Sequence, residues 1–183
     1  MVKDFGLLIL RLALGGLLGG HGSQKSFGWF GGFGLKGTAG WLESLGLKPG
    51  HVWATGAAAS ELGGGLLTAL GLFYPLGPIA TIGSMIMATA KAHWGKPIWV
   101  TEGGAELPAT NIAIATALAM TGPGRFSLDK VFGIRVPNSI IAIVIAAEAA
   151  FVTVGVLSRP APTKATQDHS AAKVESGQGS ESL

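Results

Sequence analysis

The sequence predicts an all-α fold, namely an integral membrane helical bundle of four transmembrane helices followed by a fifth. Of the 183 residues, 48% are hydrophobic and only 13% are charged, and the mean hydropathy is +0.48. A soluble domain would have about a quarter charged residues. The apolar residues gather in long segments without the alternation of a barrel strand, and a bilayer otherwise admits only helices.

Five segments account for these helices, each judged against the roughly 20 residues that cross a bilayer. They cover residues 5–20 with an extension to 22, then 52–74, 76–93, 105–121 and 138–157. Pro75 leaves only a hairpin turn between the second and third, so these two should be antiparallel neighbours. Pro108 suits the first turn of the fourth segment, which should stop at residues 122–124 (GPG).

The domain organisation follows from these segments. Residues 1–130 form a membrane domain of four helices, residues 131–157 add the fifth helix, and residues 158–183 are a polar tail expected to be disordered. The distribution of Lys and Arg places the amino terminus outside if all five helices cross, and inside if the fifth does not. Orientation therefore stays open.

Composition excludes several classes of function. The chain has no cysteine, which excludes disulfides and thiol chemistry, and no metal site is predicted. The net charge is +3 and the pI is about 9.4, but the basic residues form no stripe of the kind that binds nucleic acid. Attraction to anionic lipid headgroups explains this charge more simply.

Three ionisable residues, Arg11, Glu61 and Glu148, lie inside predicted spans and should face protein or water. If the first helix ends at His21 and the second begins at Val52, Arg11 and Glu61 both lie about 14–15 Å deep. We therefore expect an Arg11–Glu61 ion pair, with Glu148 as a competing partner or third member. The pair is interpreted either as a structural lock or as a buried proton or anion site.

Small residues predict close packing of the first two helices. Gly15 with Gly19 forms one GxxxG pattern and Gly16 with Gly20 another. The second helix repeats a small residue at every fourth position, namely Gly56, Ser60 and Gly64. Such patterns allow backbones to approach but indicate no chemistry.

A set of polar residues should meet at one end of the bundle and forms the candidate ligand-binding face: His21, Gln24, Lys25, His93, Glu102 and Glu106. The aromatic, glycine-rich connection before the second helix is expected to cover it as an interfacial or re-entrant lid, with Trp29 and Trp41 at headgroup level. The face could bind a quinone headgroup or a small anion. Ordinary interfacial polarity and haem ligation by His21 and His93 are the alternatives.

Five stretches, in order, resemble the DoxX family of membrane proteins: RLALGGLLGGHGSQKSFGWFGG, GWLESLGLKPG, ASELGGGLLTALGLFYPLG, GGAELP and ALAMTGPGRFSLD. The resemblance covers about residues 5–130 and implies a small bacterial four-helix protein of the DoxX/DoxD grouping. Its family-like positions are Arg11, His21, Gly22, Gln24, Lys25, Glu61, Gly63, Gly64, Glu106 and Pro108. It implies no catalytic residue, and neither the fifth helix nor Glu148 lies within it.

The resemblance implies a function as well as a fold. Such proteins accompany quinol oxidase or thiosulfate:quinone oxidoreductase assemblies, so we expect a multi-pass subunit or anchor of a quinone-linked oxidoreductase complex in the bacterial plasma membrane. The partners would be the lipid bilayer and other oxidoreductase subunits, with quinone as the one cofactor and none bound covalently. The alternatives are a small solute or proton transporter or channel that uses Arg11, Glu61 and Glu148, and a non-catalytic assembly factor.

Overall fold

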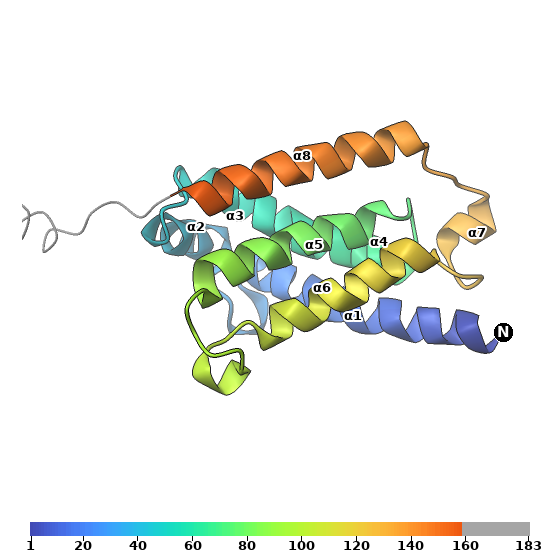
Figure 1. Ribbon diagram of the computed structural model, residues 1–183, viewed down its shortest axis with the longest axis horizontal. Coiled ribbons are helices and arrows are strands. Elements are labelled where there is room, and N and C mark those ends of the chain that lie inside the picture. The colour runs from blue at the N-terminus through green and yellow to red at the C-terminus, as the bar shows by residue number, and fades with distance from the viewer. Residues whose placement is uncertain (159–183) are drawn as a thin grey trace, which may run out of the picture.

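A computed structural model describes residues 1–158, and these form helices joined by turns, which confirms the all-α prediction (Figure 1). The α-helices are α1 (Val2–Phe27), α2 (Gly34–Ser44), α3 (Gly50–Ala58), α4 (Gly64–Leu70), α5 (Leu76–Ala88), α6 (Glu106–Thr121), α7 (Leu128–Phe132) and α8 (Asn138–Leu157). Two 3-10 turns, η1 (Trp29–Gly31) and η4 (Val100–Glu102), and two π turns, η2 (Ala59–Gly63) and η3 (Thr89–His93), complete the order. The predicted polar tail lies outside the described residues, except for Ser158.

Each π turn continues an α-helix rather than ending it. Residues 50–70 form one helical rod through α3, η2 and α4, and residues 76–93 form another through α5 and η3. The second rod ends at the predicted residue. The first ends at Gly71, which adopts the left-handed conformation (φ 62°), so residues 72–74 belong to the hairpin turn and not to the helix as expected.

The first helix is longer than the sequence suggested. Helix α1 continues through the polar stretch HGSQKS to Phe27, where Gly28 ends it in the left-handed conformation (φ 73°) and its N–H bonds to the carbonyl of Gln24. Gly28 can adopt this conformation without a steric penalty. The prediction of a helix end near residue 22 was therefore wrong.

Helices α1 and α4 pack antiparallel at very short distance. A Cβ added to Gly65 would lie 2.7 Å from the Gly19 nitrogen and 2.9 Å from the Gly15 oxygen, closer than real Cβ atoms approach. Gly22 lies just as tightly against the backbone of Leu62. The Gly15/Gly19 pattern thus serves the predicted interface.

The other small-residue patterns serve different contacts. Gly16 and Gly20 have open space beside them, so their predicted role in packing was wrong for residues 1–158. On the rod of residues 50–70, Gly64 faces α5, with Gly77 O 3.1 Å from an added Cβ, and Gly56 faces the ring of Phe151 on α8 at 3.0 Å. That rod uses its small residues to pack against three different neighbours.

Polar residues are buried and large apolar residues are exposed, the reverse of a soluble domain. The buried polar and charged residues are Arg11, Ser23, Thr38, Glu61, Thr68, Thr81, Ser84, Asn111, Ser127 and Asp129. Exposed large apolar side chains occur on most of the long helices and include Ile9, Leu12, Leu17, Leu66, Ile143 and Val154. The outer surface of the bundle is therefore largely apolar.

Helix α8 lies along α5 and is the most weakly embedded helix of the bundle (Figure 1). The Phe151 ring packs on Trp53 with centroids 4.3 Å apart, and Gly155 lies against Met87. Within residues 1–158, α8 is the one helix that is long and apolar enough by itself to cross a membrane, with a mean hydropathy of 2.5.

Candidate functional site

The bundle encloses a cavity of about 250 Å³ between α1, α2, α3, α5, α6 and α8. Its apolar wall includes Trp41, Leu47, Trp53, Met85, Met87 and Phe151. Its polar wall includes His21, Lys25, Glu61, His93, Asn111 and Glu148. An apolar pocket with a few convergent polar groups is the usual form of a small-molecule site.

Both π turns deliver polar residues to this cavity. Turn η2 contributes Ser60 and Glu61, and turn η3 contributes Lys91 and His93. A π turn adds a residue to the helical repeat and so redirects the side chains within it, and such turns occur frequently at functional sites. The coincidence of both turns with one cavity marks this end of the bundle as the candidate site.

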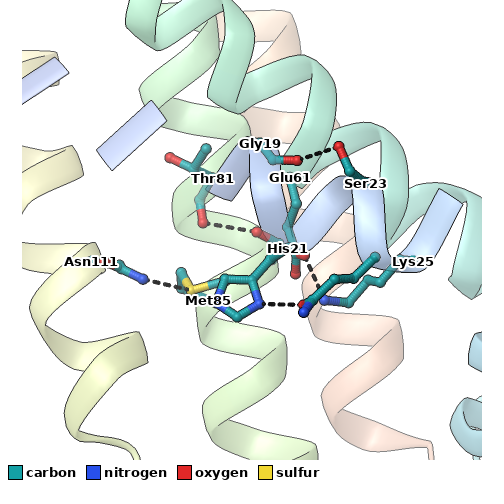
Figure 2. A network of polar contacts seen from close by, with 10 residues as sticks. Gly19, His21, Ser23, Lys25, Glu61, Thr81, Met85 and Asn111 are labelled. Atoms are coloured by element: carbon teal, nitrogen blue, oxygen red, sulfur yellow. Dashed lines mark hydrogen bonds and ion pairs between the residues drawn. The ribbon is translucent and has the colours of Figure 1, made fainter. Parts of the chain in front are cut away.

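Glu61 pairs with Lys25 (Figure 2). The Lys25 Nζ donates to Glu61 Oε2 at 2.5 Å, and the Glu61 side chain is 4% exposed. Because Gly22 packs against Leu62, the next turn of α1 brings Lys25 beside Glu61. The predicted Arg11–Glu61 pair was therefore wrong, although Glu61 is buried in an ion pair as expected.

Arg11 lies at the opposite end of α1 from this pair. Because α1 extends to Phe27, Arg11 lies level with Gly71, about 15 Å from Glu61 along the rod of residues 50–70. Its guanidinium donates to the backbone carbonyls of Pro123 and, at 2.5 Å, Phe126. Arg11 is 1% exposed, so it is a buried structural cation outside the cavity.

Asp129, which the sequence analysis did not identify, also stabilises the end of the bundle at which Arg11 lies. Its carboxylate accepts hydrogen bonds from the backbone N–H groups of Phe73 at 2.8 Å and Tyr74 at 2.7 Å. The Asp129 N–H in turn donates to the carbonyl of Gly71. Asp129 thus holds the hairpin between the two helical rods, a role that only its position in space reveals.

Hydrogen bonds hold the two histidines of the cavity. His21 Nδ1 lies 3.1 Å from Gln24 Oε1 (Figure 2). Gln24 Nε2 in turn donates to the carbonyl of Phe30 at 3.2 Å. His93 Nδ1 lies 2.6 Å from the carbonyl of Gly103. These contacts fix both rings against neighbouring turns.

The predicted polar face is only partly one site. His21, Lys25 and His93 line the cavity, and Gln24 supports His21 from behind. Glu106 instead accepts a hydrogen bond from the Val100 N–H at 2.9 Å and stabilises the turn before α6. Glu102 is exposed in η4 and does not line the cavity.

Glu148 enters the cavity from α8, against Gly83 of α5, where an added Cβ would clash with its carboxylate. It therefore shares the cavity with Glu61, whereas Arg11 does not, and the three predicted intramembrane charges do not form one cluster. Within residues 1–158, no three His, Asp or Glu side chains are grouped as a metal site.

Two further lining residues were not among the predicted site residues. Asn111 of α6 is 3% exposed, and its Nδ2 lies 3.6 Å from Met85 Sδ. A lone amide within the apolar fourth segment was the signal that could have identified it. Trp41, expected at headgroup level, lines the cavity from α2, which forms part of the predicted lid.

Together these features define an α-helical bundle with an apolar outer surface and, near one end, a cavity that has one apolar and one polar wall. Residues 6–94 match the model of the DoxX family, which assigns this part of the chain to a family of membrane proteins. The match covers α1 to α5 with η3, and so includes most of the polar wall but neither Asn111 nor Glu148. No curated protein and no solved structure matches the chain.

Proposed function

We propose that this protein is a multi-pass bundle of the bacterial plasma membrane whose cavity binds the ring of a quinone-type carrier. In this proposal it serves as a subunit or anchor of a quinone-linked oxidoreductase complex. The observation that carries the proposal is the cavity of about 250 Å³, with aromatic and methionine side chains on one wall and two histidines on the other.

The distribution of aromatic residues supports a membrane setting. Trp29, Phe30 and Phe33 are exposed in the connection after α1, and Trp94 and Trp99 are exposed between α5 and α6. Both connections lie at the same end of the bundle (Figure 1). Tryptophan favours the headgroup level of a bilayer, so this end would mark one interface, with the exposed apolar helices in the hydrocarbon.

The dimensions of the cavity suit one substituted six-membered ring. A dry apolar cavity of roughly 150 Å³ is enough for benzene, and the larger volume here leaves room for ring oxygens and methyl groups. The apolar wall would contact the ring, and imidazoles exchange protons near neutral pH. An isoprenoid tail could leave toward the lipid.

A binding titration tests the proposal. The detergent-purified protein is titrated with decyl-1,4-benzoquinone while tryptophan fluorescence is followed, since Trp41 and Trp53 line the cavity. We expect saturable quenching in the wild type. The affinity for the quinone should fall at least about tenfold in His21→Ala and His93→Ala, close to the loss of one hydrogen bond to a charged or polar partner. The matched control His51→Ala, at an exposed histidine outside the cavity, should bind normally. Absence of saturable binding would overturn the proposal.

One observation favours a second candidate, a proton or cation transporter. Two carboxylates, Glu61 and Glu148, face the same cavity from different helices. Flux into proteoliposomes that Glu61→Gln and Glu148→Gln both abolish, in a protein that binds no quinone, would support it. Arg11 would have no direct part, because it lies outside the cavity.

A further inference from the structure

The hydrogen bonds of His21 determine which ring nitrogen carries its proton. Gln24 Nε2 donates to the carbonyl of Phe30, so the amide oxygen Oε1 faces His21 Nδ1. An amide oxygen can only accept, and Nδ1 must therefore carry the hydrogen. In the neutral ring Nε2 is left as a hydrogen-bond acceptor.

His93 has the same tautomer for an independent reason. Its Nδ1 lies 2.6 Å from the backbone carbonyl of Gly103, which can only accept. Nδ1 again carries the hydrogen, and Nε2 again has a free lone pair. The two histidines on the cavity wall thus offer acceptors rather than donors.

The other polar groups on the wall reinforce this bias. Asn111 directs its Nδ2 at Met85 Sδ, which leaves the amide oxygen available as an acceptor. Each lysine on the wall already donates to a protein acceptor. Lys25 donates to Glu61, and Lys91 donates to the carbonyls of Val156 and Ser158 at the end of α8.

We propose that the cavity selects the hydroquinone form of its ligand over the quinone form. This inference rests on the proposed function and adds the redox state that the site prefers. The carrying observation is the juxtaposition of two Nε2 acceptors, from His21 and His93, with the Asn111 amide oxygen around one cavity.

The chemistry of the two ring forms differs at their oxygens. A quinone carbonyl only accepts, so it can bond to a donor such as an indole N–H but would leave the Nε2 lone pairs of His21 and His93 unpaired. A hydroquinone hydroxyl donates to an imidazole and can still accept from an indole N–H of Trp41 or Trp53. The reduced form therefore satisfies more of the wall.

Anaerobic titrations with decyl-1,4-benzohydroquinone and decyl-1,4-benzoquinone test the preference in the full chain. We expect the hydroquinone to bind at least about tenfold more tightly, which would raise the midpoint potential of the bound two-electron couple by about 30 mV. Equal binding, or tighter binding of the quinone, would overturn this inference and leave the proposed function standing. Saturable binding of neither form would overturn both.

A variant of Gln24 tests the tautomer as the cause. Gln24→Met removes the acceptor that holds His21, so His21 can carry its proton on either nitrogen. We expect the preference for hydroquinone to fall at least about threefold, with quinone binding unweakened, and ¹⁵N-histidine spectra to show loss of the Nδ1–H form. A structural defect would weaken both ligands. Ser26→Ala, on the same helix and outside the cavity, should keep the preference; an unchanged preference in Gln24→Met would contradict the tautomer mechanism.

Discussion

Helix α1 carries a buried cation, Arg11, toward its amino-terminal end and a half-buried one, Lys25, at the cavity end, in contrasting surroundings. At the amino-terminal end, Arg11 donates to backbone carbonyls of a distant segment, and Asp129 receives backbone N–H groups, with neither lining the cavity. At the cavity end, Lys25 pairs with a side chain, Glu61, and both line an open volume.

The difference separates structural charges from candidate functional ones. A charge whose partners are backbone groups is committed to the fold, because the backbone cannot leave without unfolding. A charge on a cavity wall keeps hydrogen-bonding capacity for a ligand. The predictions below test this distinction, from the largest expected effect to the smallest.

Arg11→Met should produce the largest loss of stability. The change removes the donor from the part-buried carbonyls of Pro123 and Phe126, which we expect to lower the free energy of unfolding by about 3 kcal/mol. The midpoint of thermal unfolding in detergent measures it. Arg125→Met is the matched control, since only the backbone N–H of Arg125 makes a described hydrogen bond. An unchanged midpoint in Arg11→Met would break the contrast between the ends.

Gly22→Ala should disturb the cavity end next most strongly. The added methyl would meet the backbone of Leu62 beside Glu61, which a rigid helix pair cannot relieve cheaply, and we expect a loss of about 1–3 kcal/mol. Gly16→Ala, on the same helix with nothing within 4 Å, should be neutral or stabilising by up to about 1 kcal/mol. Thermal unfolding of both variants tests the contrast, and equal destabilisation would contradict the observed packing.

The Lys25–Glu61 pair should show a smaller, coupled effect. Lys25 is 23% exposed, so we expect a coupling free energy of about 1 kcal/mol in a double-mutant cycle of Lys25→Met and Glu61→Gln. Unfolding midpoints of the four proteins measure it. The combination of Arg11→Met with Glu61→Gln is the control cycle and should be additive, because these residues lie far apart. Coupling only in the control cycle would restore the Arg11–Glu61 pairing.

Asp4→Asn should have the smallest effect on stability, and the size of this effect should change only at acidic pH. A hydrogen bond from the backbone N–H of Arg125 lowers the pKa of Asp4 below its usual value. A lowered folded pKa contributes stability above the unfolded pKa, and this contribution is lost as the pH falls through the folded pKa. The midpoint difference between the wild type and Asp4→Asn should therefore be present at about pH 6 and shrink as the pH falls below about 4. A constant difference would exclude this linkage.

The sequence was sufficient to predict the helices because long apolar segments and their Pro and Gly boundaries are local signals. The rods at residues 76–93 and 138–157 agree with expectation to the residue. The end of α1 was missed because HGSQKS is polar and suggested an exit from the bilayer, whereas Gly28 is the true stop. Because the predicted end of the first helix was wrong, the estimated depth of Arg11 was wrong too, and Glu61 was predicted as its partner.

The site was predictable only in part, for a different reason. His21, Lys25 and His93 could be placed at one end from helix order alone. The partners of Arg11 are backbone carbonyls, which every residue carries, so no residue pattern reveals them. The only sequence signal of the π turns is the presence of polar residues within apolar helices. Asn111 and Glu148 line the cavity because of how α6 and α8 pack, which the sequence does not reveal.

The contact between Arg11 and Pro123 also constrains the order of biosynthesis. The two residues are separated by 112 positions, so at about 5–20 residues per second the carbonyl appears roughly 6–22 s after the arginine. During that interval the newly made first helix contains a cation without its final acceptors. Arg11 can reach these acceptors only after the chain beyond α6 has been made, which makes closure of the amino-terminal end a late step of assembly.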